Sequence, residues 1–568
     1  MAAKQQLLAT IKKLGLYSVA KAVVADRNLR QLPLVLKTSN SGNASLVELA
    51  YGPNHSKNQR KTAVEALLEL ARESKNSEQL AVLENHLSAF AGSGPRQRSV
   101  EVETYREFIR TGNTTQTQLI YARANFGLTL PDALFGAETK RKLQISWLNS
   151  LLELHGLATL DFDSKVKPLT IDDLPALIGR VPAKMGGPKI SVLLPVFNGE
   201  EFIHTALAGL AAQSYRNIEV LVIDDASTDG TRELVKKFAA ADKRFKLIEE
   251  KVNGGSYRAR NIGLGQATGE FVTVHDADDW SHPQKLELQV APLIAQPRLL
   301  ATLSQGIRVA HESLRFLTVA NGLYIRQNIS SLMFRREPIQ AAIGYWDEVL
   351  FGGDSEFHER IEAQFGASSV KLVNAGPLSF TRFLASSLTG GGYASTQSGI
   401  TGIRRFYVDS YNFWHEQIKA GRLSPKIGRA SAGRPFAAPP LQHDRKAKYA
   451  KFELVLVADL TSSRQNEAAA VLKQVAGLKR VGLLNLSAAG ERLNPAILSA
   501  VDFEKVSLLL PGDKATAKVV RILNSAALGH APKVMAELTA DTVEFVNEEA
   551  ARVEHRATAK KLFGGAEK

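Results

Sequence analysis

The chain contains no cysteine among its 568 residues. Disulfide frameworks, thiolate metal sites and cysteine nucleophiles are therefore excluded. This absence fits a reducing cytoplasm, although many exported proteins also lack cysteine. Long apolar runs are missing too: no stretch approaches the roughly 18–20 uncharged apolar residues that span a bilayer. The N-terminal segment carries charge throughout and has no compact apolar core before a small-residue cleavage site, so we expect no signal peptide.

Acidic residues are outnumbered, with 57 Asp and Glu against 71 Lys and Arg, which gives a formal net charge of +14. A net positive charge suggests anionic binding partners such as nucleic acid, anionic lipid or phosphate-bearing substrates. The excess is concentrated in residues 1–30 and 418–451. These segments are either solvated basic stretches or contacts with an anionic lipid or polymer surface. No RNA- or DNA-binding motif stands out, so nucleic acid is not an expected partner.

The pattern along the chain predicts three folded parts and a linker. Residues 1–185 form a mainly helical N-terminal region, because apolar residues recur at helical spacing. Residues 186–420 alternate short apolar strands with helices, which predicts a largely parallel sheet. Residues 421–450 are rich in Gly, Pro, Ser and basic residues and read as a linker. Residues 451–568 predict a smaller α/β domain, in which QNEAAAVLKQVAG and KATAKVVRILNSA are expected to be helical.

Polar clusters follow successive strands of the middle region, at residues 198–200, 224–229, 253–256 and 276–279. In a parallel sheet, ligands bind beyond the carboxyl ends of the strands. Magnesium and manganese ions take one or two carboxylates together with phosphate oxygens of a substrate. The run HDADDW is the strongest candidate for such a site, since its acids follow an apolar strand directly. The alternative is that these acids cap the helix that follows.

Four stretches, taken in order, resemble the nucleotide-binding half of family 2 glycosyltransferases. PKISVLLPVFNGEEFI resembles the first strand and its turn, NIEVLVIDDASTDGT the second strand with its Asp-Asp-x-Ser signature, NGGSYRARNIGLGQATGEF the stretch before the metal motif, and HDADD the Asp-x-Asp element. The resemblance covers roughly residues 188–390. It implies a GT-A fold, which is a Rossmann-like, mainly parallel α/β domain. It also implies an inverting, metal-dependent transfer of sugar from a nucleotide-diphosphate sugar, with UDP-sugar expected, to a hydroxyl acceptor in bacterial polysaccharide or cell-envelope glycan synthesis.

The resemblance further assigns roles to single residues. The positions that it implies for nucleotide binding are Pro195, Phe197, Glu200, Asp225, Asn253, Gly254, Arg258 and Asp276. The first three would border the nucleoside, Asp225 would accept a hydrogen bond from the base, and Asp276 would lie near the ribose. Asp278 would be the direct ligand of a divalent cation, Mn²⁺ or Mg²⁺. Plainer roles stay open: Pro195 ends a strand, Asp225 caps a turn, and the arginines 258 and 260 are exposed on their helix.

The segment GYWDEVLFGGDSEFHERIEAQFG resembles the region that carries the family's catalytic acid. The family's usual Glu-Asp pair is replaced here by Gly353-Asp354. Asp354 is therefore the expected general base, with Glu356 as its rival and with a helix N-cap as the structural alternative. Further on, RFLASSLTGGG resembles a flexible segment that closes over the donor, so that Arg382 would reach the diphosphate; an ordinary glycine-rich loop is the alternative.

Two other functions stay open at this point. A sugar nucleotidyltransferase also uses an α/β nucleotide site and a metal, but the turn after the first strand holds Asn198-Gly199-Glu200 rather than a glycine-rich loop with a basic signature. A catalytically inactive GT-A scaffold or binding protein is the second alternative. The expected partners are a nucleotide-sugar donor, a glycan or lipid-linked acceptor and an anionic membrane surface. The expected location is the cytoplasm, with peripheral contact at the inner face of the plasma membrane.

Overall fold

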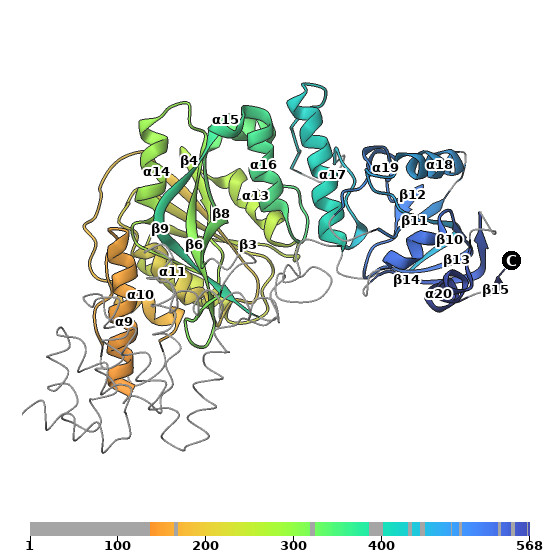
Figure 1. Cartoon of the computed structure of the whole chain (residues 1–568). Coiled ribbons are helices and arrows are strands. Elements are labelled where there is room, and N and C mark those ends of the chain that lie inside the picture. The colour runs from red at the N-terminus through yellow and green to blue at the C-terminus, as the bar shows by residue number, and fades with distance from the viewer. Residues whose placement is uncertain are drawn as a thin grey trace, which may run out of the picture.

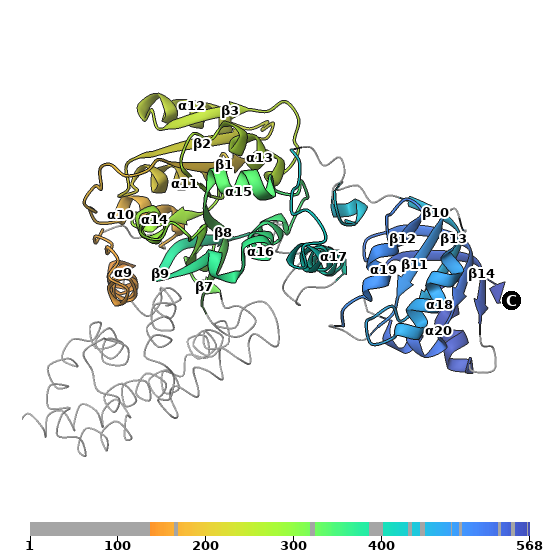
Figure 2. The ribbon, with the colours of Figure 1, turned by 90° about the horizontal axis from the view of Figure 1, so that it is seen from above.

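The computed structural model describes residues 137–567, except for gaps at 164–168, 318–323, 385–401, 430–433, 443–448, 477, 479, 488–490, 532–534, 547–550 and 565. The helices expected before residue 137 and the basic segment at residues 1–30 lie outside these residues. The described part forms two α/β bodies, each built around its own sheet, and helix α17 (Gly402–Lys419) lies between them (Figures 1 and 2). No helix within the described ranges is both long and apolar enough to cross a membrane.

The larger sheet has nine strands in the order β3-β2-β1-β4-β8-β6-β9-β5, with β7 paired to β6. The strands are β1 (Ile190–Val196), β2 (Ile218–Asp224), β3 (Phe245–Glu249), β4 (Phe271–Val274), β5 (Trp280–Ser281), β6 (Ala301–Ala310), β7 (Phe316–Leu317), β8 (Ile325–Arg335) and β9 (Val370–Phe383). The first four run parallel to one another, whereas β8 runs antiparallel to both β4 and β6. The expected α/β class with a mainly parallel sheet is confirmed.

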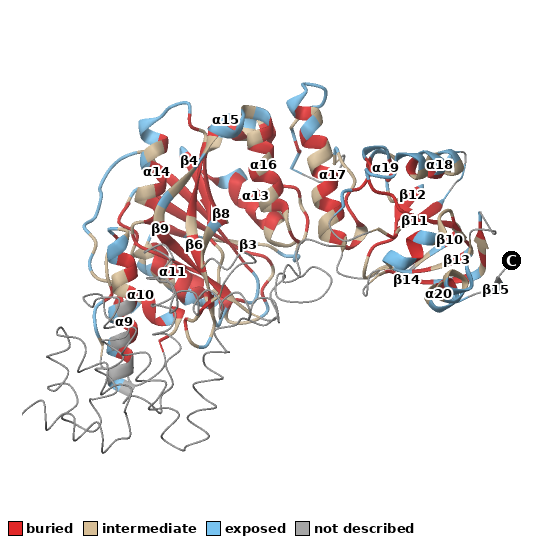
Figure 3. Cartoon of the chain, in the orientation of Figure 1, coloured by how far each residue is buried: buried red, intermediate tan, exposed pale blue. Residues whose placement is uncertain are grey.

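Helices cover both faces of this sheet. They are α11 (Ile203–Ala211), α12 (Thr231–Ala241), α13 (Ser256–Gln266), α14 (Lys285–Ala295), α15 (Arg336–Ile343) and α16 (Gly353–Phe365). Every residue of β1 and β2 is buried, as continuous apolar runs in a doubly covered parallel sheet require (Figure 3). Alternate side chains of β1 enter different cores: Leu193 packs with α13 and α16, while Val192 and Leu194 pack with α11 and α14. This double burial fixes the strand ends where the polar clusters lie.

The described part of the N-terminal region is packed onto the larger sheet. It comprises α9 (Ala137–Leu154), the 3₁₀ helix η3 (Ile171–Asp173) and α10 (Leu174–Leu177). Leu148 and Leu151 of α9 share one hydrophobic core with Trp280, Phe316 and Phe380 of the sheet. We therefore propose that the catalytic domain includes the described residues from Ala137 on rather than beginning at residue 186, because removing this segment would expose that core to water.

The described parts of residues 421–450 also pack against the larger sheet's body, although their composition predicts a linker. Ile427 forms a bridge with Gly344, and Ala438 belongs to the core under α13 and α16. Arg434 forms an ion pair with buried Asp347 at 2.8 Å. Glycine, proline and basic residues dominate this segment, but a few apolar anchors and one buried ion pair are enough to fix it. We propose that it belongs to the catalytic domain.

The smaller sheet has six parallel strands in the order β12-β11-β10-β13-β14-β15. Its elements are β10 (Tyr449–Ala458), α18 (Gln465–Val475), β11 (Val481–Asn485), α19 (Pro495–Ala500), β12 (Val506–Leu508), β13 (Lys514–Ile522), β14 (Glu537–Phe545), α20 (Val553–Phe563) and β15 (Ala566–Glu567). The helix predicted for KATAKVVRILNSA is wrong, because residues 514–522 form β13 and pair with β10 on one side and β14 on the other. Burial alternates along this strand, and sheet pairing overrides the helical propensity of its alanines.

Helix α17 belongs to the cores of both bodies. Its residues Tyr407 and Tyr411 pack into the core of the larger sheet. Its residues Ile403 and Phe406 pack with Leu456 of β10 and its neighbours in the smaller sheet. The two bodies are therefore joined by a shared apolar surface as well as by the chain.

Candidate active site

Asp225 follows β2 and holds the loop that precedes α13. Its two carboxylate oxygens accept hydrogen bonds from the backbone N–H groups of Gly254, at 2.9 Å, and Gly255, at 2.7 Å. Burial raises the pKa of this carboxyl, while the two amide hydrogen bonds and the nearby Arg258 act in the opposite direction. Because each carboxylate oxygen has a further lone pair, Asp225 can accept another hydrogen bond at this edge.

The turn after β1 brings the other expected nucleoside neighbours to the same edge. Pro195 is buried within β1. The strand continues to Val196, so Pro195 does not end it. Phe197 is 43% exposed and presents a flat apolar ring at the surface. Glu200 accepts a hydrogen bond from the backbone N–H of Gly230, 2.8 Å away, at the start of α12. The turn is thus fixed to the β2–α12 loop.

Asn253 and Arg258 flank the glycine loop differently. Asn253 is exposed. The Arg258 side chain is 35% exposed and forms an ion pair with Glu250 at 3.1 Å, which turns it back towards the end of β3. Its guanidinium does not touch the acidic motif in this structure.

The acidic motif follows β4. Asp276 accepts a hydrogen bond from the guanidinium of Arg260 at 2.9 Å, and buried Asp279 accepts one from the backbone N–H of Arg382 at 2.8 Å. Burial and the negative charge of Asp276 raise the pKa of Asp278 to about 6. The next helix, α14, begins at Lys285 and its N-cap is residue 284, so these aspartates do not cap it.

The motif fits a cation that is shared with a substrate. Within the described ranges, no group of three or more His, Cys, Asp or Glu side chains is arranged to hold a metal ion by itself. A Mg²⁺ or Mn²⁺ ion at Asp278 would therefore need further oxygens from water or a diphosphate, which is how these ions bind in nucleotide sites. A cation there would also offset the repulsion between the carboxylates of Asp276 and Asp278.

Helix α13 connects the acidic motif to Asp354. The Arg260 side chain is only 5% exposed, so the alternative that it is solvated is wrong. Besides its bond to Asp276, its guanidinium lies 4.9 Å from the ring centre of Tyr257. The Tyr257 hydroxyl in turn donates a hydrogen bond to Asp354 Oδ1 at 3.0 Å. The sequence indicated neither contact, although a spacing of three residues places Tyr257 and Arg260 on one helix face.

Asp354 lies in the first turn of α16. The N-cap is Gly352 in a left-handed conformation, so Asp354 is not the capping residue. Its Oδ1 also accepts a hydrogen bond from the backbone N–H of Ser355 at 2.9 Å, and its Oδ2 lies 3.5 Å from the Ser330 hydroxyl of β8. Ser330 also borders a small polar cavity behind the acidic motif, which it shares with Asp276 and Asp279. Asp354 and the motif therefore flank the same stretch of β8.

Glu356, the rival base, is turned into the protein. Its side chain is fully buried and forms ion pairs with Arg360 at 3.0 Å and His415 at 3.1 Å. Arg360 is equally buried and donates to the carbonyls of Ile343 and Tyr345. These contacts hold α16 against α17 and the preceding loop, and they leave Glu356 without access to a substrate.

Arg382 lies within β9, and the glycine segment that follows it lies outside the described residues. Its side chain is fully buried and forms a two-pronged ion pair with Asp172 of η3, with Nη1 at 3.1 Å from Oδ2. Its Nε donates to the backbone carbonyl of Asp278 at 2.9 Å, and its guanidinium stacks on Phe202 at 4.7 Å from the ring centre. In this structure Arg382 holds the acidic motif in place through the backbone carbonyl of Asp278 and the carboxylate of Asp279.

Residues 191–333, from the second residue of β1 to within β8, match the family model described as Glycosyl transferase family 2. This region is a family 2 glycosyltransferase domain. Asp354, Arg382 and Asp172 lie outside the matched residues, whereas the expected nucleotide and metal positions up to Asp278 lie within them.

Curated relatives support the same family for this domain. An uncharacterized glycosyltransferase of Haemophilus influenzae is 42% identical over 106 residues, which is 19% of this chain and 42% of the relative. The putative glycosyltransferase EpsE of Bacillus subtilis is 42% identical over 106 residues, 18% of this chain and 38% of EpsE. The putative teichuronic acid biosynthesis glycosyltransferase TuaG of the same organism is 34% identical over 103 residues, 18% of this chain and 41% of TuaG. The chain thus spans less than half the length of each of these relatives.

Among solved structures, residues 1–349 of TarS from S. aureus in complex with UDP-GlcNAc align with a TM-score of 0.33 at 22% identity. The alignment covers 41% of this chain and 71% of that one.

We predict that Asp172→Asn destabilises the glycosyltransferase domain by about 1–3 kcal/mol, because it leaves the buried guanidinium of Arg382 without its anionic partner. Asp172 is 40% exposed, which reduces the effect below that of a fully buried pair. Urea unfolding followed by tryptophan fluorescence measures this, since all four tryptophans lie between residues 147 and 414. Asp161→Asn, at an exposed position of the same segment, is the matched control. Equal midpoints for both variants would contradict the prediction.

Proposed function

We propose that the protein is an inverting glycosyltransferase. It moves a sugar from a nucleoside-diphosphate sugar, with UDP as the expected nucleotide, to a hydroxyl group of a polysaccharide or cell-envelope glycan. The observation that carries the proposal is the line of contacts from Asp276 through Arg260 and Tyr257 to Asp354. The acidic motif and Asp354 both adjoin Ser330 of β8, which supports one site for the donor and the candidate base. The family of residues 191–333 and the polymer-related names of relatives such as TuaG support it.

The donor would lie across the carboxyl ends of β1, β2 and β4. Asp225 would accept a hydrogen bond from the base, and Phe197 would offer an apolar face beside the nucleoside. Asp278 would hold Mn²⁺ or Mg²⁺, and such an ion, when bound, stabilises the charge that develops on the leaving diphosphate. Arg382 would keep the loop in place through the carbonyl of Asp278.

Asp354 would act as the general base. As the acceptor oxygen bonds to the anomeric carbon, the bond from that carbon to the diphosphate breaks and the hydroxyl proton passes to the Asp354 carboxylate. Attack from the face opposite the diphosphate inverts the anomeric centre, so one base is sufficient and no covalent sugar intermediate is needed. The hydrogen bond from Tyr257 orients the carboxylate for this step.

The test is release of nucleoside diphosphate from a panel of UDP-, GDP- and TDP-sugars with Mn²⁺ or Mg²⁺. We expect slow hydrolysis of one donor without acceptor, abolished by EDTA and restored by adding the cation. UTP with sugar 1-phosphates serves as the control for a nucleotidyltransferase, and we expect no pyrophosphate from it. Absence of turnover together with absence of a donor-induced rise in Tm across the panel would reject the transferase in favour of a scaffold.

A further inference from the structure

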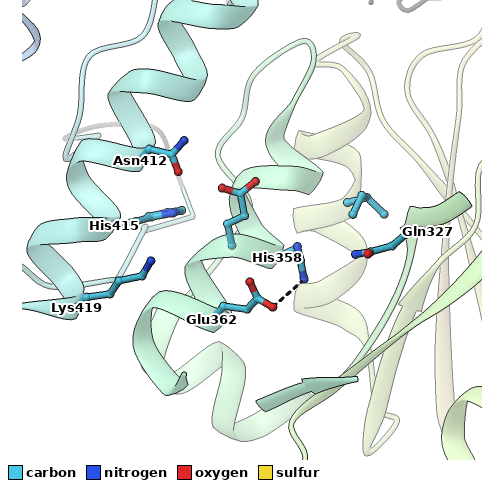
Figure 4. Close-up of a pocket in the computed structure, with 8 residues that line it drawn as sticks. Gln327, His358, Glu362, Asn412, His415 and Lys419 are labelled. Atoms are coloured by element: carbon cyan, nitrogen blue, oxygen red, sulfur yellow. Dashed lines mark ion pairs between the residues drawn. The ribbon is translucent and has the colours of Figure 1, made fainter. Parts of the chain in front are cut away.

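A polar groove of about 520 Å³ lies between α16, α17 and β8, and of its lining residues only His415 has been described so far. Figure 4 shows side chains of α17 and of β8 facing each other across α16. The lining residues used below are Gln327 of β8, His358, Glu359 and Glu362 of α16, and Asn412 and Lys419 of α17.

The chemistry of this lining matches a ring that carries several hydroxyl groups. Carboxylates of Glu359 and Glu362 accept hydrogen bonds, amides of Gln327 and Asn412 both donate and accept, and Lys419 donates. A phosphate group would meet two carboxylates. A metal ion held by side chains alone is disfavoured as well, because no group of three or more His, Cys, Asp or Glu side chains in the described residues is arranged to hold one. A sugar satisfies donors and acceptors together, since each hydroxyl does both.

The groove continues the face of α16 that carries the candidate base. Asp354, His358 and Glu362 are spaced four residues apart, so they lie on one side of the helix. Four residues rise about 6 Å, which places the groove one to two helical turns from Asp354. The negative charges of Asp354 and Glu362 both raise the pKa of the His358 imidazole, but burial has the larger effect and lowers that pKa. A sugar in the groove would therefore lie next to the hydroxyl that reacts.

We propose that this groove binds a sugar residue of the acceptor glycan and that Glu359 and Asn412 hold it. The inference rests on the proposed function and adds a binding site for the acceptor and the residues that form it. The Tyr411 hydroxyl donates to Glu359 Oε1 at 3.2 Å and fixes the carboxyl. Among the described residues this is the hydrogen bond that Glu359 makes, so its Oε2 is left for a ligand. Burial raises the pKa of Glu359 to about 7 against the effect of this bond, so near neutral pH the carboxyl both donates and accepts.

Binding of simple sugars to the full chain tests the proposal. The probes are methyl glycosides of glucose, galactose, N-acetylglucosamine and N-acetylgalactosamine and their β-linked disaccharides, observed by saturation-transfer NMR. We expect at least one to bind, and we expect Glu359→Ala and Asn412→Ala each to weaken its binding about tenfold, because each variant removes hydrogen bonds of a carboxyl or amide group. Glu416→Ala, on an exposed position of α17, should bind like the wild type.

Donor hydrolysis without acceptor, measured in the same variants, separates the two proposals. We expect it to stay at the wild-type rate, because neither Glu359 nor Asn412 contacts the nucleotide edge. Failure of every probe to bind the wild type, or equal affinity in the wild type and both variants, would overturn the groove as an acceptor site even if donor turnover is intact. Sugar binding that both variants lose, in a protein with no donor turnover, would support a sugar site and reject the transferase.

Discussion

Asp354→Asn is expected to lower acceptor-dependent transfer by about 10²–10⁴-fold, which is the usual contribution of a general base. Asparagine keeps the size of the side chain and its contacts with Tyr257 and Ser330, but it cannot take the proton of the acceptor hydroxyl. Donor hydrolysis without acceptor should change far less, because Asp278 rather than Asp354 is the proposed ligand of the cation that stabilises the leaving diphosphate. The measurement is initial rate of nucleoside-diphosphate release with and without acceptor, together with Tm to confirm folding.

Glu356→Gln is the informative comparison for this variant. We expect it to lower Tm rather than to remove the acceptor-dependent step, because it leaves buried Arg360 and His415 without their anion. If Glu356→Gln kept its Tm and lost transfer while Asp354→Asn retained full transfer, the assignment of the base would be wrong.

Asp278→Asn is expected to reduce both donor hydrolysis and transfer by at least about 100-fold, since charge stabilisation of a leaving group by one positioned site is worth about that much. The amide removes the charge that binds a cation but keeps the backbone carbonyl that Arg382 contacts. The half-saturating Mn²⁺ concentration should rise, which distinguishes this variant from Asp354→Asn.

Nucleoside-diphosphate release across a Mn²⁺ titration measures this second effect, and Asp161→Asn is the exposed control. An unchanged rate with an unchanged metal dependence would show that Asp278 is not the metal ligand. If the rate of donor hydrolysis by the wild type did not depend on the cation concentration, the enzyme would instead be metal-independent.

The nucleotide-binding half of the sheet was predictable because local sequence determines it. Continuous apolar runs such as β1 and β2 signal buried parallel strands, and the acids that follow them mark the ligand edge. Asp225, Asp276 and Asp278 therefore lie at the same edge of the sheet, as the strand order β2-β1-β4 requires. The role of Asp354 as the base was predicted only from the resemblance to a family, because no local sequence pattern connects α16 to that edge.

The remaining contacts depend on pairs that are distant in the chain. Asp172 and Arg382 are 210 residues apart, and Glu356 meets His415 across 59 residues. No periodic pattern in the sequence predicts such pairs, because each partner by itself resembles an ordinary charged surface residue. The same limit explains β13, whose alanines favour a helix until β10 and β14 supply their hydrogen-bonding edges.

Helix α17 links the C-terminal domain to the polar groove, because it packs into the core of that domain and lines the groove. A recombination that exchanged the C-terminal domain with a cut in residues 421–450 would inherit the apolar stripe around Ile403 and Phe406 with no surface to cover it. A successful exchange must therefore bring a new domain with a matching apolar face, or must replace α17 too and with it one wall of the polar groove. Change in the C-terminal domain and change in the groove are in this way tied to each other during evolution.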